Sequence, residues 1–270
     1  MPTLPVVVHE FTVPIRDWPQ DHAGLQIAHV SDFHFRRWNE TLRHAQNLLA
    51  TLDYDLLLVT GDFGNFRRHW LHTAEMTRRF FDPLVSRAPI YAVLGNHDNP
   101  QLPTVEDQPL TFLRNHTIRV RVMGGELNLA GIEQTKRGGG DLDATLAAAR
   151  PDAPTVLLAH YPSTVLRVPP GRVQLVLSGH THGGQIKLPW LGCVWPNDRI
   201  PRRLARGVHE VNGTKVHVSA GIGSSPPLPV RINCPPELSL LTLVPADASY
   251  SPSLDAMTRR KIRRPAVATI

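Results

Sequence analysis

Short apolar runs that end abruptly in polar residues are the feature that most constrains how this chain can fold. Four of them lie in the first 160 positions, and they read LQIAHV (25–30), DLLLVT (55–60), IYAVLG (90–95) and TVLLAH (155–160). Each run has the length of one buried strand and is too short for a buried helix. The sequence therefore predicts strands that are covered on both faces.

Helical patterns alternate with the first of these strands. Apolar residues recur at helical spacing over 39–52 and 67–85. From about residue 116 strands dominate, and we predict a helix at 141–150, with Asp141 as its N-cap, and strands at 117–122, 126–132, 173–178, 214–221 and 237–244. This order predicts an α/β sandwich of two sheets. A length of 270 residues predicts one main domain.

Potential metal ligands follow five of the predicted strands directly. In chain order they are Asp32 and His34, Asp62, Asn96 with His97 and Asp98, His160, and finally His180 and His182. The carboxyl ends of strands in open α/β sheets usually line the ligand crevice. We therefore expect these side chains to meet at one rim.

Carboxylate, amide and imidazole donors without a thiolate predict Mn²⁺, Fe²⁺ or Zn²⁺ in a hydrolytic site rather than a structural zinc. Seven donors are too many for one ion, but with one shared carboxylate they fill two adjacent coordination spheres. The segment SGHTHGGQ (178–185) surrounds two of the histidines with Gly179, Gly183 and Gly184. We expect these glycines to let the backbone bend tightly and a substrate phosphate approach.

The segments SDFH, GDF, GNHD, a single His and GHTH stand in the order that is typical of calcineurin-like metallophosphoesterases, and the chain resembles that family over about residues 5 to 245. The stretches GHTHGGQIKLPWLG and SAGIGSSPPLPVRINCPPELSLLTL resemble its bacterial phosphodiesterase branch. The resemblance implies a four-layer αββα sandwich of two mixed β-sheets flanked by helices. It also implies a catalytic domain over 1–248, which leaves 249–270 as a basic, flexible tail.

The resemblance further implies the role of each site residue. One metal ion is expected on Asp32, His34, Asp62 and His182, and the other on Asp62, Asn96, His160 and His180, with Asp62 as the bridge. A hydroxide between the ions then attacks phosphorus in line. His97 protonates the leaving oxygen, and Asp98 orients His97. Arg36 and Gln185 are weaker candidates for substrate binding.

The predicted activity is that of a metal-dependent phosphoric ester hydrolase, with a phosphodiester preferred and manganese among the expected metals. One alternative is a pyrophosphate hydrolase that acts on a nucleotide-linked lipid precursor such as UDP-2,3-diacylglucosamine. An alternative of another class is a non-catalytic scaffold for protein interaction, which the intact ligand set argues against. No obligate protein partner is evident in the sequence.

Charge and apolar content bear on where the chain works. Lys and Arg number 29 against 23 Asp and Glu, and the tail sequence TRRKIRRPAVATI contributes part of the excess. Because no aromatic residues interleave these charges, a nucleic-acid partner is not expected. No window has the apolar length of a membrane span or a secretory signal, which favours a cytoplasmic location. Peripheral contact with lipid stays open through Trp190 and Trp195, although we expect both indoles to be packed inside.

Overall fold

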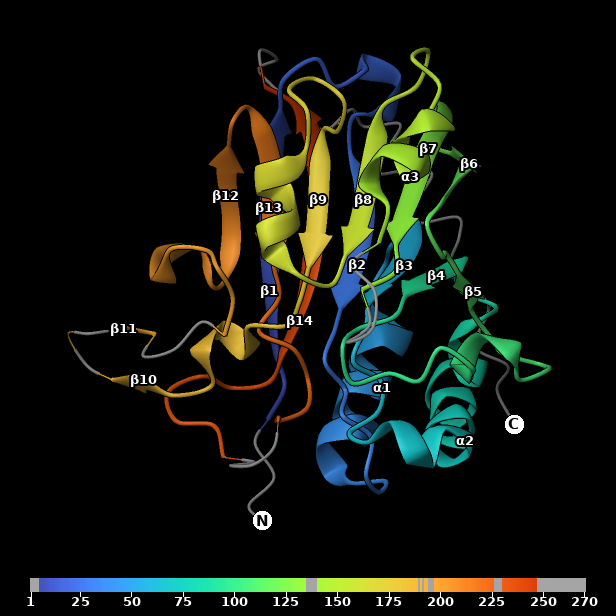
Figure 1. Ribbon diagram of the computed structural model, residues 1–270, viewed down its shortest axis with the longest axis vertical. Coiled ribbons are helices and arrows are strands. Elements are labelled where there is room, and N and C mark those ends of the chain that lie inside the picture. Colours follow the sequence, from blue (N-terminus) through green and yellow to red (C-terminus); the bar gives the residue numbers. More distant parts are fainter. Residues whose placement is uncertain are drawn as a thin grey trace.

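The computed structural model describes residues 5–134, 140–188, 190, 192–193, 197–225 and 230–246. The basic tail, Trp195 and most of the glycine-rich stretch at 136–141 lie outside these ranges. Two six-stranded mixed sheets form the centre of the fold (Figure 1). The prediction of two mixed sheets flanked by helices is confirmed.

The first sheet contains the strands nearest the two ends of the described chain. Its order is β1 (Val7–Ile15), β14 (Glu237–Pro245), β2 (Leu25–Val30), β3 (Leu56–Thr60), β4 (Ile90–Val93) and β5 (Thr111–Phe112). Strands β2 to β5 are parallel, so their carboxyl ends share one edge. Strand β14 runs antiparallel to β2 and parallel to β1.

The second sheet is built mainly from the middle of the chain. Its order is β12 (Gly207–Val211), β13 (Thr214–Val218), β9 (Leu175–Ser178), β8 (Thr155–Ala159), β7 (Gly125–Ile132) and β6 (His116–Val122). The four central strands are parallel, and the two edge strands are antiparallel to their neighbours. A short hairpin of β10 (Lys187–Leu188) and β11 (Gly192–Cys193) stands apart from both sheets (Figure 1).

Alternating side chains of the strands fill three apolar layers. In β3, Leu56 and Leu58 pack between the two sheets, whereas Leu57 and Val59 pack under the helices. Successive residues of a strand point to opposite faces, and both faces of β3 are covered. This arrangement explains the continuous apolar run that the sequence shows at this strand.

Helices α1 (Glu40–Thr51) and α2 (Trp70–Phe81) cover the outer face of the first sheet. Helix α3 (Leu142–Ala147) and the 3₁₀ helix Pro162–Arg167 cover the outer face of the second sheet. The Asp141 side chain accepts a hydrogen bond from the backbone N–H of Ala144, which confirms its predicted capping role. Of the helices within the described ranges, none combines the length and apolar character that crossing a bilayer requires.

Candidate metal centre

All seven predicted ligands lie at one edge of the sandwich and are buried. The first sheet supplies Asp32 and His34 after β2, Asp62 after β3 and Asn96 after β4. The second sheet supplies His160 after β8 and His180 and His182 after β9. Both sheets therefore end at the same place and face each other across the cluster.

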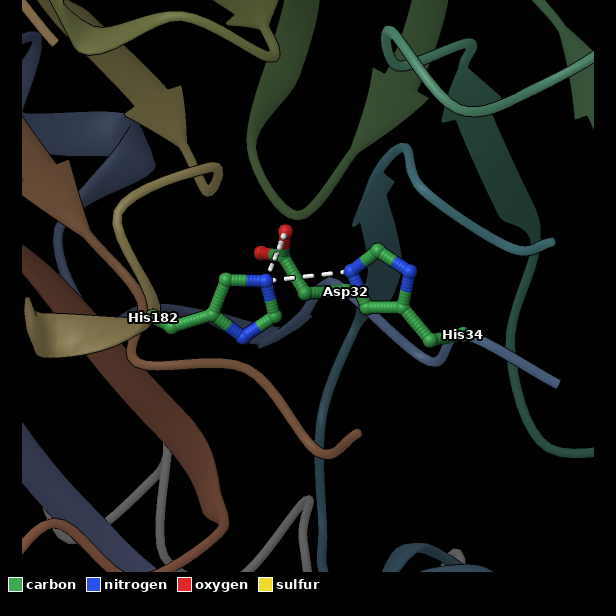
Figure 2. A group of neighbouring side chains, drawn as sticks. All are labelled: Asp32, His34 and His182. Atoms are coloured by element: carbon green, nitrogen blue, oxygen red, sulfur yellow. Dashed lines mark hydrogen bonds and ion pairs between the residues drawn. The ribbon is translucent and has the colours of Figure 1, made fainter. Parts of the chain in front are cut away.

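The first group of ligands consists of Asp32, His34 and His182, whose donor atoms lie within 4.8 Å of one another. Figure 2 shows the three side chains converging, with the two imidazole rings on either side of the carboxylate. The Nε2 atoms of His34 and His182 are 3.0 Å apart, and Nε2 of His182 is 3.5 Å from Oδ1 of Asp32. Three donor atoms thus point at one small volume.

The second group consists of Asp62, His160 and His180, within the same 4.8 Å limit. Oδ1 of Asn96 lies 3.1 Å from Nε2 of His160, which adds a neutral oxygen donor. Oδ2 of Asp62 lies 3.3 Å from Nε2 of His160 and 3.6 Å from Nε2 of His34. One carboxylate oxygen therefore faces both groups.

Backbone groups fix the orientation of the ligands. Nδ1 of His160 is 2.7 Å from the carbonyl of Thr60, and Nε2 of His180 is 2.7 Å from the carbonyl of Asn197. Because a carbonyl only accepts, each of these ring nitrogens is the N–H donor, which turns the opposite nitrogen of the ring toward the ligand cluster. Oδ1 of Asp62 accepts from the backbone N–H of His97 at 2.8 Å, which leaves Oδ2 for the shared position.

Buried charges in the second group compensate each other. Burial would raise the pKa of Asp62, but His160, His34 and His97 together hold it well below its usual value. Burial lowers the pKa of His160, but Asp62 and Asp32 raise it to about 10. The Asp62 carboxylate therefore stabilises a positive charge at this position, whether the His160 ring or a bound cation carries it.

Burial is the largest influence on the pKa values of the other imidazole ligands. It lowers the pKa values of His34 and His180 to about 3 and that of His182 well below its usual range. Burial also raises the pKa of Asp32 to about 6, against the charge of His160. Neutral imidazoles present the lone pairs that metal ions bind.

Five of the seven ligands have left-handed backbone conformations. Their φ angles are +52° for Asp32, +47° for His34, +55° for Asp62, +69° for His180 and +51° for His182. Such conformations cost non-glycine residues roughly 1–3 kcal/mol each, and they persist only where the surrounding structure enforces them. Strain concentrated on these residues marks the cluster as a functional site.

Taken together, the donors fit two divalent ions. The facing Nε2 atoms of His34 and His182 are 3.0 Å apart, and both would be ligands of an ion in the first group. Carboxylate, amide and imidazole donors without a thiolate suit Mn²⁺, Fe²⁺ or Zn²⁺.

The glycines of SGHTHGGQ make room for the ligands and for two cysteines. A side chain on Gly179 would collide with Ser31 Oγ and Asp32 Oδ2. Gly183 and Gly184 have positive φ angles and pack against the sulfur atoms of Cys234 and Cys193, which are both buried. The tight bend is as predicted, and the close approaches that these glycines permit include one to the ligand Asp32 and two to cysteine sulfurs.

His97 lies beside the ligands, whereas the Asp98 side chain bonds to backbone groups and not to His97. The ring centroid of His97 is 5.1 Å from that of His34, and its Nδ1 is 3.2 Å from the carbonyl of Asn65. Asp98 instead accepts hydrogen bonds from the backbone N–H groups of Asp62 at 2.8 Å, Gly64 at 3.0 Å and Gly95 at 2.9 Å. Asn65, and not Asp98, orients the His97 ring in this structure.

Asp98 therefore holds the ligand loops together. Its side chain joins the segment that follows β3 to the segment that follows β4, which is a structural task. Burial raises the pKa of Asp98 to about 7, with a further contribution from the charge of Asp62 and opposition from the amides of Gly64 and Gly95.

The two weaker candidates for substrate binding have different positions. Arg36 is exposed, and its backbone carbonyl faces His72. Gln185 accepts the backbone N–H of Ser225 at 2.9 Å, so it links the turn after His182 to the loop after β13.

Several residues near the centre had no signal in the sequence. Arg231 is buried and donates to the carbonyls of Ala220 at 2.7 Å and Gly221 at 3.1 Å, and its Nη2 lies 3.3 Å from Nδ1 of His182. Arg67 and Tyr161 border the second group. Only their short distances in sequence from Asp62 and His160 could have pointed to them.

The sequence matches the calcineurin-like phosphoesterases over residues 25–184. This chain belongs to that family. It is 28% identical to the metallophosphoesterase YkuE of Bacillus subtilis over 249 residues, covering 87% of this chain and 84% of YkuE. It is also 28% identical to the phosphodiesterase YaeI of Escherichia coli over 244 residues, covering 82% and 83%.

More distant similarities extend to two further proteins. The UDP-2,3-diacylglucosamine pyrophosphatase LpxG of Chlamydia trachomatis is 23% identical over 222 residues, covering 62% of this chain and 66% of LpxG. Among solved structures, the NAD nucleotidase of Haemophilus influenzae has a TM-score of 0.47 at 15% identity, covering 73% of this chain and 50% of that one. Family membership and the two ligand groups identify a metal-dependent hydrolase of phosphoester bonds.

Proposed function

We propose that the chain hydrolyses a phosphodiester at a centre of two divalent ions. The single observation that supports this most strongly is the position of Asp62 Oδ2, which faces Nε2 of His160 and Nε2 of His34 at 3.3 and 3.6 Å. One ion would be held by Asp32, His34, Asp62 and His182, and the other by Asp62, Asn96, His160 and His180. The similarity to YaeI, a phosphodiesterase by name, favours the diester.

The ions, when bound, supply Lewis acidity at the phosphoryl oxygens and an activated water nucleophile. The protein contributes fixed geometry, because backbone carbonyls orient His160 and His180 and a backbone amide orients Asp62. Nδ1–H of His97 donates to the carbonyl of Asn65, so Nε2 is left to donate a proton to the leaving oxygen when the ring is charged. We assign His97 as the general acid.

Hydrolysis of bis-p-nitrophenyl phosphate tests the proposal. The chelated protein, loaded in turn with Mn²⁺, Fe²⁺ and Zn²⁺, should turn over this diester with at least one ion, and Asp62→Asn should lose most of the rate. Comparing the rates with the three ions gives the metal preference, and we expect Mn²⁺ to support hydrolysis. If the parent has no metal-dependent turnover, the non-catalytic scaffold replaces this proposal.

A specific surface favours a lipid-linked pyrophosphate as the second candidate substrate. Trp190, at the turn of the β10–β11 hairpin, is fully exposed, which overturns the expectation that it packs inside. Val230 and Ile232 are 42% and 45% exposed, and Ile186 and Ile232 form a β-bridge, so these apolar side chains lie beside the hairpin. An exposed Trp with neighbouring apolar side chains is suited to a membrane interface.

The hairpin starts five residues after His182, which places this apolar surface next to the centre in the chain. The similarity to LpxG, a UDP-2,3-diacylglucosamine pyrophosphatase by name, also supports a lipid-linked pyrophosphate as the substrate. Trp190→Ala should slow hydrolysis of UDP-2,3-diacylglucosamine in vesicles and leave bis-p-nitrophenyl phosphate unaffected. Equal rates of parent and variant on the lipid would remove this candidate and the peripheral membrane contact.

A further inference from the structure

Arg67 lies on the loop that connects β3 to α2, within the 3₁₀ helix Arg67–His69 and five residues after Asp62. Its Nη2 donates to the backbone carbonyl of Asn96 at 3.2 Å. Its own carbonyl accepts from Nδ2 of Asn99 at 2.9 Å. These two bonds fasten Arg67 to the loop that carries the Asn96 ligand and hold the guanidinium at the edge of the second ligand group.

Unlike several other arginines, Arg67 has no carboxylate partner within the described ranges. Arg114, Arg119 and Arg206 each pair with a Glu, whereas the described contact of the Arg67 guanidinium is a neutral carbonyl. Its Nε is buried and has no hydrogen-bond acceptor among the described atoms. An unneutralised guanidinium beside a site for two divalent cations is unfavourable unless an anion comes between them.

Tyr161 provides a second donor on the same side. Its ring centroid is 4.5 Å from that of His180 and 5.4 Å from that of His160, so the side chain borders the second group. A phenol hydroxyl can donate a hydrogen bond, so Tyr161 offers an O–H donor beside this group.

We propose that Arg67, assisted by the Tyr161 hydroxyl, binds a non-bridging oxygen of the substrate phosphoryl group and holds that group against the two ions. The inference rests on the proposed function and assigns the residue that anchors its anionic substrate. A guanidinium suits this task because its planar N–H groups match phosphoryl oxygens. The bond to Asn96 fixes it in advance, so it can stabilise charge on those oxygens without rearrangement.

Arg68 provides a matched control. It is exposed, its guanidinium lies 5.7 Å from the Phe66 ring centroid, and its Nε donates to His69. Arg67→Ala should lower kcat/KM for bis-p-nitrophenyl phosphate by about 100-fold and raise the inhibition constant of inorganic phosphate by at least about tenfold. Arg67→Lys should recover part of both losses because the charge is kept and the fork is lost. Arg68→Ala should stay within about twofold of the parent, since its charge faces solvent.

Two further measurements separate anchoring from a structural role. Metal content per chain shows whether the centre is intact, and calorimetric titration with inorganic phosphate, on the Mn²⁺-loaded protein, reports binding without turnover. With a full complement of metal, weaker phosphate binding in Arg67→Ala supports the proposal. It is overturned if phosphate binds Arg67→Ala as tightly as the parent, or if both Arg67 variants lose the metals.

The outcome also distinguishes this inference from the proposed function. A parent that neither turns over the diester nor binds phosphate contradicts both. A parent that is active, with Arg67→Ala indistinguishable from Arg68→Ala, contradicts the role of Arg67 alone.

Discussion

The Oδ2 atom of Asp62 lies 3.3 Å from Nε2 of His160, and these two residues come from different sheets. The other oxygen of Asp62 is held by the backbone N–H of His97. The carboxylate therefore cannot turn away, and its free oxygen joins the second ligand group to His34 of the first. Under the proposed function, the cluster would depend on Asp62 to hold two ions.

Replacing Asp62 with Asn should abolish the two-ion centre. The amide offers one neutral oxygen, whereas the parent carboxylate offers a charged oxygen that both groups share, so we expect fewer than two ions per chain. Because several kcal/mol of charge stabilisation are lost, kcat should fall by at least about 10³-fold. Elemental analysis and the diester assay measure the two effects.

Asp107→Asn is the control for this prediction, because Asp107 is exposed and also has a positive φ of +56°. It should retain both ions and full activity. Two ions per chain in Asp62→Asn would contradict the bridging role.

Replacing His97 with Ala should affect substrates according to their leaving groups. A general acid contributes typically 10²–10⁴-fold, but p-nitrophenolate leaves without a proton whereas an alkoxide does not. We expect a small loss for nitrophenyl diesters and a large loss for alkyl diesters, seen as a steeper dependence of log kcat on leaving-group pKa. An equal loss for both classes, with metal content unchanged, would assign His97 another task.

Replacing Asp98 with Asn should act on stability rather than on proton transfer. The parent side chain accepts three backbone N–H groups, and an Asn side chain turns one acceptor into a donor. We expect the free energy of unfolding to fall by about 2 kcal/mol or more, measured with denaturant. The dependence of log kcat on leaving-group pKa should match that of the parent. If Asp98→Asn instead shows the steeper dependence expected for His97→Ala, Asp98 has the role in orienting His97 that the sequence predicts.

The strands and the ligands could be predicted because both depend on local pattern. The prediction for 25–30 coincides with β2, and that for 55–60 differs from β3 by one residue. Parallel strands bring their carboxyl ends to one edge, so a polar residue just after such a strand is placed by topology alone. Seven candidate ligands followed from this regularity, and the structure brings their side chains together.

The remaining features depend on contacts between residues that are distant in sequence. Strand β1 lacks a long apolar run because it lies at the edge of the first sheet with alternate side chains exposed, and its pairing is with β14, at the far end of the described chain. The partner of Asp98 and the bond from Arg67 to Asn96 follow from how two loops fold over each other. Exposure of Trp190 results from a hairpin that leaves the body of the fold, which an apolar sequence cannot reveal.

Replacing Gly179 with Ala should damage the first ligand group selectively. A Cβ there would meet Ser31 and the Asp32 carboxylate, both fully buried, so Asp32 must move. We expect loss of one ion per chain and most of the activity. Gly213→Ala is the control, because a Cβ there meets nothing within 4 Å and its φ of +81° costs only about 1 kcal/mol of strain. Retention of both ions in Gly179→Ala would show that Asp32 is not positioned by this contact.

The buried histidine pair His29 and His217 should make stability depend on acid pH. Their Nδ1 atoms are 2.8 Å apart, and Nε2 of His29 is 2.9 Å from the Thr60 hydroxyl. Burial lowers the pKa of His29 to about 3, and burial together with His29 lowers that of His217 to about 3. The two rings are therefore neutral in the folded protein.

Below pH 6.5 the unfolded chain binds protons on both rings, while the folded chain binds them only near pH 3. Stability is thus present above pH 6.5 and falls as the pH drops toward 3, by up to about 1.4 kcal/mol per pH unit for each ring. Denaturant unfolding with chelator between pH 8 and 4.5 measures the slope. The double variant His29→Asn with His217→Asn has neither ring, so its slope should be smaller by the contribution of up to two protons. The exposed His116→Asn should keep the slope of the parent. An unchanged slope in the double variant would mean that the pair is already charged in the folded protein.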